Sequence, residues 1–296
     1  MSDNLVELTW NNPIKSLQNI FCGCTNITEN DFEEFDTSQI IRTNNLFFNC
    51  ISLTSINLST FDTSRVIRLD YMFYNCSSLT SLNISHFKTS NVERMEQMFC
   101  NCHLLTSLDL SQFNTSNVEL MNHMFYNCSS LISLDLSHFN TSKVKSMQRM
   151  FSGCLLLVSL DVSNFDTSNV IKMDYMFFNC YSLTSLNLSN FDTSQVTIMN
   201  HMFCICSSLI SLDLSNFNTS NVTNINSMFY NCSSLISLNL SNFDTSKVTR
   251  MQYMFYCCYN LNYINLQNFN DIELTDSSSY KNMFYGIPDN LVICIN

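Results

Sequence analysis

The stretch from Met228 to Tyr253 reads M-F-Y-N-C-S-S-L-I-S-L-N-L-S-N-F-D-T-S-K-V-T-R-M-Q-Y, and close copies of these 26 residues make up most of the chain. Two residue types keep this period without a slip. The first is cysteine, at Cys24, Cys50, Cys76, Cys102, Cys128, Cys154, Cys180, Cys206, Cys232 and Cys258. The second is phenylalanine, at Phe35, Phe61, Phe87, Phe113, Phe139, Phe165, Phe191, Phe217, Phe243 and Phe269. Two ladders that stay in register over so many periods identify a repeat protein.

Two apolar patterns alternate inside each unit. Leu238 and Leu240 flank Asn239, and this alternation is typical of a short strand with one buried face. After the D-T-S turn, apolar residues follow at the spacing of one helix face: Val248, Met251, Met254, Phe255 and Cys258. The Thr-Ser pair of that turn stands where a helix N-cap is expected. Each unit is therefore predicted to be a strand, a turn and a short helix.

A unit of this size cannot bury its apolar residues alone, so the units have to stack. The sequence predicts an α/β solenoid, a right-handed superhelix of about ten strand–turn–helix coils with a parallel sheet on one face. We expect a single repeat domain over residues 1–296. Residues 1–34 would form an N-terminal cap with a degenerate, weaker first strand, 35–269 the regular coils, and 270–296 a C-terminal cap. Within that cap, residues 291–295 would close the last open edge as a strand.

Composition narrows the classes of function. Charged residues make up only 12% of the chain and the formal net charge is −11, which disfavours nucleic acid and anionic membranes as partners. Residues 1–4 lack the cationic start of a secretory signal, and no apolar run approaches the ~18 residues of a membrane-spanning helix. No glycine-rich phosphate loop, nucleophile elbow or H-E-x-x-H motif occurs. We therefore expect a protein that is not an enzyme, with no catalytic residues, no cofactor and no membrane insertion.

A polar stripe is the candidate binding site. It occupies the position between the two buried residues of each strand, where it faces solvent with serines on both sides. Its residues are Asn83, Asp109, Asp135, Asp161, Asn187, Asp213 and Asn239. Asp109, Asp135 and Asp161 follow one another in successive coils, so they could share a cation such as Ca²⁺. The alternative is a solvated polar face without a ligand, and no metal ligand is assigned.

The cysteine ladder has three interpretations. The thiols could fill small apolar holes beside phenylalanine and methionine in the core. Neighbouring coils could instead bring thiols within disulfide range, or thiols could bind a metal, although no pair of C-x-x-C motifs is present. Buried thiols are the favoured interpretation, because the count of 15 cysteines is odd and no leader directs the chain to an oxidising compartment.

The phrase M-F-x-N-C-S-S-L-T-S-L-N-L-S-x-F-D-T-S-x-V-x-x-M resembles the repeat of one known family, the BspA-like leucine-rich-repeat surface proteins of the mycoplasma lipoprotein type. The resemblance covers about residues 14–284. It implies a leucine-rich-repeat-like solenoid that is displayed at the cell surface or secreted and that takes part in adhesion. This sequence departs from the family in two respects: no leader or anchor is visible, and Phe stands where many leucine-rich repeats place Asn or Cys.

Three functions fit these observations. The leading one is a non-enzymatic protein-binding or adhesion module, whose concave strand face or varied helix face contacts a protein or another host or extracellular macromolecule. The helix face varies between coils, as in Glu93-Arg94 against Lys145-Ser146. The second is an intracellular scaffold for protein assembly, which the missing leader favours and which would place the chain in the cytoplasm. The third is a lattice surface for a glycan or ice, matched to the regular Ser-Asn/Asp-Ser stripe.

Overall fold

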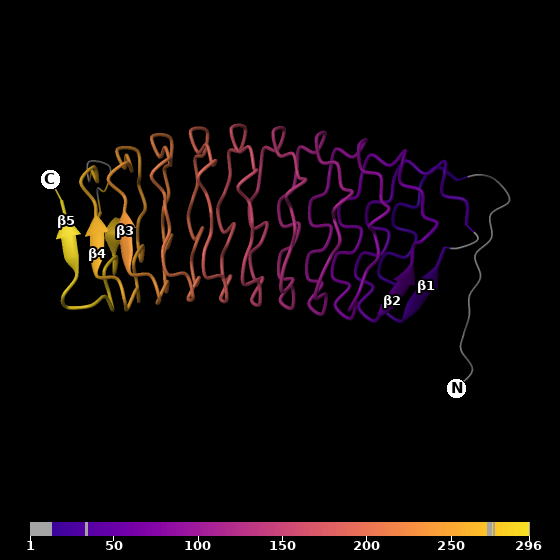
Figure 1. Cartoon of the computed structure of the whole chain (residues 1–296), viewed down its shortest axis with the longest axis horizontal. Coiled ribbons are helices and arrows are strands. Elements are labelled where there is room, and N and C mark those ends of the chain that lie inside the picture. Colours follow the sequence, from indigo (N-terminus) through magenta and orange to yellow (C-terminus); the bar gives the residue numbers. More distant parts are fainter. Residues whose placement is uncertain (1–13, 33–34, 271–273, 275, 296) are drawn as a thin grey trace.

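The computed structural model describes residues 14–32, 35–270, 274 and 276–295, which form one elongated stack of coils (Figure 1). Equivalent residues of neighbouring coils lie side by side. Parallel bridges between equivalent residues trace the stack from Ser16–Arg42 to Asn224–Arg250. The prediction of a solenoid is confirmed. Residues 1–13, which include the start of the expected N-terminal cap and the segment judged to lack a leader, lie outside the described residues.

The described residues include five short strands, which lie at the two ends of the stack. Two of them, β1 (Glu29–Asp31) and β2 (Ser55–Asn57), pair in parallel at the N-terminal end. At the C-terminal end, β3 (Ser237–Asn239), β4 (Tyr263–Asn265) and β5 (Val292–Cys294) form a second parallel sheet. The closing strand expected within residues 291–295 is thus present as β5. The degenerate first coil forms β1, which pairs with β2 over all three of its residues.

The helix predicted in each coil is absent from the described residues, whose single helix is the 3-10 helix η1 (Ser277–Tyr280). In its place lies a turn segment, residues 69–76 and their equivalents in the other coils. Alternate N–H groups of this segment donate to the next coil, such as Phe73 to Met98 O at 3.0 Å. The groups between them donate within the segment, such as Cys76 to Phe73 O at 3.2 Å. No described helix is long and apolar enough to cross a membrane.

Left-handed residues explain why the turn segment is not a helix. Tyr71 has a φ of 59° and Asn75 a φ of 55°, and a right-handed helix requires a negative φ throughout. The second of these positions is Asn in most coils, and all three glycines of the chain, Gly23, Gly153 and Gly286, also occupy it. Asn and Gly tolerate this conformation best. The turn segment nevertheless buries residues at helix-like spacing, and this spacing is the reason why the sequence pattern predicted a helix.

One residue in this column is poorly suited to it. Ile205 has a φ of 62°, although a β-branched side chain strongly disfavours the left-handed region. We expect Ile205→Asn to raise the free energy of unfolding by about 1 kcal/mol, because it removes that cost. Urea denaturation checks this, with Ile205→Val as the matched control that keeps the branch and gives no gain. An Ile205→Asn protein no more stable than the valine variant would contradict the prediction.

The D-T-S turn joins the strand to the turn segment through hydrogen bonds rather than a helix N-cap, which corrects the predicted role of Thr-Ser. The Ser246 N–H donates to Asp244 Oδ1 at 2.9 Å, which is an Asx turn. The threonine is buried and bonds to the next coil. Thr115 Oγ1 donates to the carbonyl of Asn140 and accepts the N–H of the same residue, both at 2.8 Å. Equivalent bonds recur along the stack and form a threonine ladder.

The spacing of the coils differs across the solenoid. Equivalent aromatic rings of neighbouring coils stack nearly parallel, so the distance between their centroids measures the local spacing. The distances are 4.9 Å for Tyr230–Tyr256, 5.7 Å for Phe229–Phe255 and 6.4 Å for Phe217–Phe243. Tyr230 lies in the turn segment and Phe217 follows the strand position, so the coils fan apart toward the strand side.

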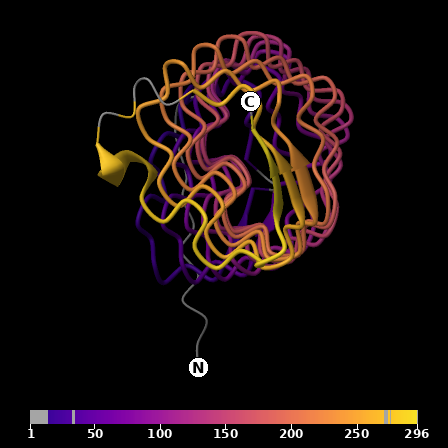
Figure 2. The ribbon, with the colours of Figure 1, turned by 90° about the vertical axis from the view of Figure 1, so that its left-hand side faces the viewer.

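This fan has two consequences. Hydrogen-bonded strands lie about 4.8 Å apart, and the wider spacing explains why the described coils between β2 and β3 form no sheet. The predicted sheet along the whole face was therefore wrong for the middle coils. The strand side is also convex, and in Figure 2 the middle coils bulge past both ends on the side marked by the strand arrows. The expectation of a concave strand face was wrong for the same reason.

The core consists of the predicted ladders. Phe151 stacks with Phe125 at 5.8 Å and with Phe177 at 5.7 Å, and all three rings are buried. The ladder cysteines from Cys50 to Cys258 are buried beside them. The Cys154 thiol donates to the carbonyl of Phe125, and burial raises the pKa of this thiol to about 12. A protonated thiol is a poor nucleophile and metal ligand, so these cysteines serve packing.

Candidate binding face

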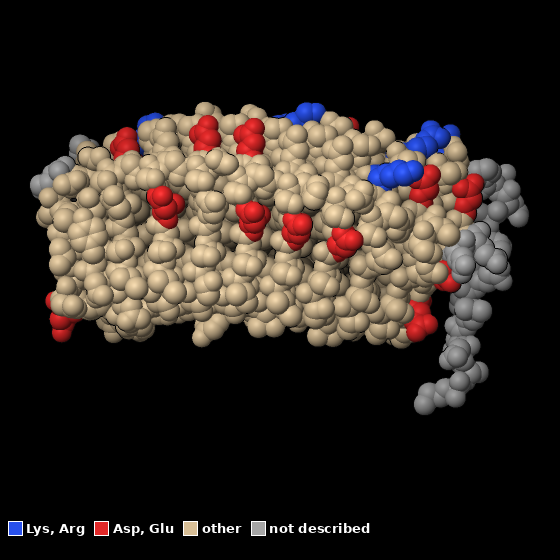
Figure 3. Space-filling model, in the orientation of Figure 1, with Lys and Arg blue, Asp and Glu red and all other residues tan. Residues whose placement is uncertain are grey.

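The strand face comprises the exposed side chains of residues 131–139 and of the equivalent segments from 53–61 to 261–269. All residues of the predicted stripe are exposed on this face: Asn83, Asp109, Asp135, Asp161, Asn187, Asp213 and Asn239. The acidic members form the row that crosses the middle of Figure 3. The stripe therefore lies where a partner could reach it.

Each stripe residue also has a local structural task. Asp135 Oδ1 accepts the N–H of Ser137 at 2.9 Å, and Asn239 Oδ1 accepts the N–H of Ser241 at 3.1 Å. Asp and Asn thus form the same Asx turn at the end of the strand segment, which explains why they interchange between coils. The backbone hydrogen bond from Ser137 is the main cause that lowers the pKa of Asp135. The two residue types differ in what they present to solvent, which is a charged carboxylate in Asp and a neutral amide in Asn.

An apolar row runs beside the stripe, and the sequence reasoning missed it. Ile132, Val158, Ile210 and Ile236 are 53%, 48%, 50% and 48% exposed. They occupy the same position of their coils, three residues before the stripe, and Thr184 fills that position in the coil between Val158 and Ile210. Large aliphatic side chains held half in solvent leave much of their apolar area unburied. They are suited to contact with another protein.

The strand face carries no lysine or arginine, and its basic side chains are the histidines His86 and His138. All 13 lysines and arginines of the chain lie outside its segments, and those visible in Figure 3 lie in the upper part of the view, above the acidic row that crosses its middle. Four stripe aspartates remain on it. Among the described residues, no group of three or more His, Cys, Asp or Glu side chains is placed to hold a metal ion. The spacing of Asp109, Asp135 and Asp161 therefore does not assemble the shared cation site considered from the sequence.

A second surface, along the turn segments, holds a column of stacked side chains. The Arg149 guanidinium lies 4.5 Å from the centre of the Tyr175 ring, which stacks with His201 at 4.4 Å. Gln148 Nε2 donates to the buried carboxylate of Asp174 at 2.5 Å. Burial, followed by the charge of Arg149, lowers the pKa of His201. These side chains are engaged with one another across coils.

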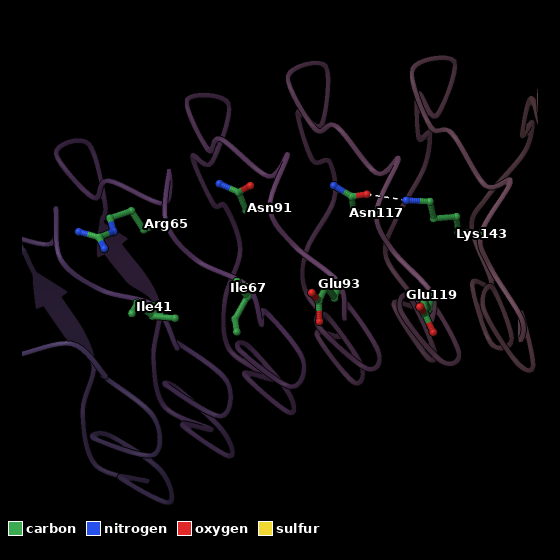
Figure 4. Close-up of a pocket in the computed structure, with 8 residues that line it drawn as sticks. All are labelled: Ile41, Arg65, Ile67, Asn91, Glu93, Asn117, Glu119 and Lys143. Carbon is green, nitrogen blue, oxygen red and sulfur yellow. Dashed lines mark hydrogen bonds between the residues drawn. The ribbon is translucent and has the colours of Figure 1, made fainter.

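A third surface is a groove of about 520 Å³ on the varied face, drawn in Figure 4. Its lining residues are Ile41, Arg65, Ile67, Asn91, Glu93, Asn117, Glu119 and Lys143. Several of its polar groups bond to neighbouring coils, such as Lys143 Nζ to Asn117 Oδ1 at 2.7 Å and Asn91 Nδ2 to Ser64 O at 2.7 Å. The basic side chains of Arg65, Lys143 and Lys145 on this face each bond to a neighbouring coil.

The sequence matches one protein family, described as "Mycoplasma protein of unknown function, DUF285". The match covers three overlapping stretches, residues 15–133, 101–209 and 179–290. Together they extend over most of the chain and over all of the strand-face segments. A comparison with curated proteins found no match.

Similar solved structures include three bacterial proteins. A leucine-rich repeat protein from Bacteroides ovatus is 18% identical, with 98% of this chain and 90% of that chain covered and a TM-score of 0.35. For a leucine-rich cell surface protein from Faecalibacterium prausnitzii the identity is 17%, the coverage 99% and 86%, and the TM-score 0.45. For an internalin from Listeria monocytogenes the identity is 16%, the coverage 84% and 82%, and the TM-score 0.28.

Proposed function

We propose that this chain, which belongs to the mycoplasma protein family DUF285, is a non-enzymatic protein-binding module that contacts its partner through the strand face. One observation carries the proposal. The half-exposed row of Ile132, Val158, Ile210 and Ile236 runs alongside the polar stripe. An aliphatic row bordered by hydrogen-bonding groups has the composition of a protein interface, in which apolar side chains are surrounded by a polar rim.

The apolar surface extends beyond that row. Leu104, Leu156 and Tyr181 are 48%, 50% and 56% exposed, and each lies two or three residues before the row position in its own coil. Contiguous exposed apolar surface on a soluble repeat protein marks an interaction site. The stripe residues Asn83, Asp109, Asp135, Asp161, Asn187, Asp213 and Asn239 belong to the same proposed interface.

Adhesion is the form of protein binding that we propose. Its support is the resemblance of the repeat to BspA-like surface proteins, together with a convex face that many coils build jointly and that a large extracellular protein can approach without obstruction. An intracellular scaffold would use the same face, and the two differ in the partner and the compartment. The experiment below therefore uses extracellular matrix proteins as the probe.

We expect the purified protein to bind immobilised laminin or fibronectin, and the double variant Ile132→Asp/Ile210→Asp to bind at least about tenfold more weakly. Burial of two carboxylates in place of two aliphatic contacts costs more than about 1.4 kcal/mol, which corresponds to that factor. Biolayer interferometry measures the dissociation constants, and circular dichroism verifies that the variant remains folded.

Ile171→Asp is the matched control. Ile171 is 46% exposed and lies outside the strand-face segments, in the row that lines the groove in other coils, so its substitution should leave binding unchanged. Equal binding by the wild type and the double variant would refute the strand face as the interface. Absence of binding to either matrix protein would refute adhesion.

A further inference from the structure

We infer, on the basis of the proposed function, that the strand face binds a basic polypeptide segment in extended conformation, laid along the axis of the solenoid with Lys or Arg at every second residue. The stripe supplies the charges for this segment. Asp109, Asp135 and Asp161 lie in three consecutive coils, and Asp213 follows two coils later.

Within the described residues, no lysine or arginine pairs with the carboxylates of the stripe. The three ion pairs within the described part of the chain are Arg68–Asp70, Arg94–Glu96 and Lys145–Glu119, and none involves the strand face. All lysines and arginines belong to other segments. A face with four exposed carboxylates and no lysine or arginine favours a cationic partner.

A second copy of the chain does not meet this requirement. Its formal net charge is −11, so two copies repel each other at long range. Two arginines of each copy, Arg68 and Arg94, are already paired with Asp70 and Glu96 at 2.8 and 2.9 Å. The partner must therefore bring basic side chains from a different protein.

The coil spacing on this side selects an extended conformation. Equivalent rings four residues beyond the stripe, Phe87–Phe113 and Phe217–Phe243, have centroids 6.4 Å apart, and we take this distance as the step between neighbouring coils at the stripe. In an extended strand, side chains on one face follow one another at about 6.6 Å. Alternate residues of a strand laid along the axis consequently stay in register with the stripe over several coils. A helix repeats at about 5.4 Å per turn and does not.

The stripe contains its own control substitution. Asn already occupies this position at Asn187 and Asn239, where it accepts the same serine N–H as aspartate does, at 3.1 Å. Changing the four aspartates to asparagine therefore removes the charge and leaves the Asx turns intact. The first position of the D-T-S turns allows the same Asp-to-Asn change at a different place on the surface. They carry Asp62, Asp166, Asp192 and Asp244 in some coils and Asn114, Asn140 and Asn218 in others.

The test uses two synthetic peptides of 12 residues, one alternating Lys and Thr and one with six Lys followed by six Thr. We expect the alternating peptide to bind the wild type at least about tenfold more tightly than the block peptide, with an affinity that falls as salt rises. The variant with Asp109, Asp135, Asp161 and Asp213 all changed to Asn should lose at least about tenfold of that affinity, since four ion pairs are removed. Fluorescence anisotropy gives the dissociation constants.

The variant with Asp62, Asp166, Asp192 and Asp244 all changed to Asn has the same net charge and should keep the affinity within about twofold, since only the mean field changes. Equal loss in both variants, or equal binding of the two peptides, would overturn the inference. Binding to laminin or fibronectin that depends on Ile132 and Ile210 but not on the four stripe aspartates would leave the proposed function standing and refute the basic partner.

Discussion

Thr115→Val is expected to lower the free energy of unfolding by about 3 kcal/mol, although valine has nearly the same shape as threonine. The Thr115 side chain is buried, and its hydroxyl is bonded to both the carbonyl and the N–H of Asn140 in the next coil. Valine leaves that donor and acceptor of Asn140 without their partner, next to a side chain that is itself buried. Each buried polar group left unsatisfied costs about 1–3 kcal/mol. Urea denaturation followed by circular dichroism measures the loss.

Thr115→Ser is the matched control, because serine keeps the hydroxyl and removes only a methyl group. It should cost about 1 kcal/mol, the transfer energy of that group. Ser116→Ala tests the exposed side of the same turn, where the hydroxyl donates to Asn114 Oδ1 at 2.7 Å, and it should cost well under about 1 kcal/mol. If valine and serine destabilised the protein equally, the threonine ladder would contribute packing only.

The sequence predicted those parts of the fold that depend on apolar residues buried at a regular spacing. The cysteine and phenylalanine ladders identified the stacked coils and their core, and the alternation around Asn239 identified the strand position that became β3. The helix was not distinguishable from the turn segment by burial, because both place apolar residues three and four positions apart. The distinguishing signal was present elsewhere. The position that is Asn in most coils is Gly in three others, at Gly23, Gly153 and Gly286. A repeat position filled mainly by Asn and Gly indicates a left-handed backbone.

The candidate face was also predictable only in part from the sequence. Exposure of Asp135 followed directly from its place between two buried residues. The apolar row was missed because Ile132 stands in the run L-I-S-L and looks like core. Thr106 and Thr184 hold the equivalent position in other coils, and a core position would not alternate between Ile and Thr. The convex shape could not be predicted, because it depends on ring spacings that vary across one coil and that no residue type specifies.

The largest loss is expected in the middle of the stack. Phe151→Ala should lower the free energy of unfolding by about 4 kcal/mol, because it opens a cavity in a fully buried site and removes the ring between Phe125 and Phe177. Each coil contacts only its neighbours, so the damage stays local and weakens the coupling between the two halves of the solenoid. Urea denaturation should therefore become broader or biphasic, with a smaller apparent m-value than the wild type.

Phe178→Ala separates this effect from a general loss of aromatic area. Phe178 lies in the next coil, is partly exposed on the outer side of its turn segment and has Tyr175 at 5.5 Å as its nearest ring. Its replacement should cost about 1 kcal/mol and leave a single transition, since solvent fills the space that the ring vacates. If the two alanine variants lost equal stability, or if Phe151→Ala unfolded in one sharp transition, the buried aromatic column would not be what couples the coils. That coupling would then have to reside in the hydrogen bonds of the turn segments and the threonine ladder, which neither substitution alters.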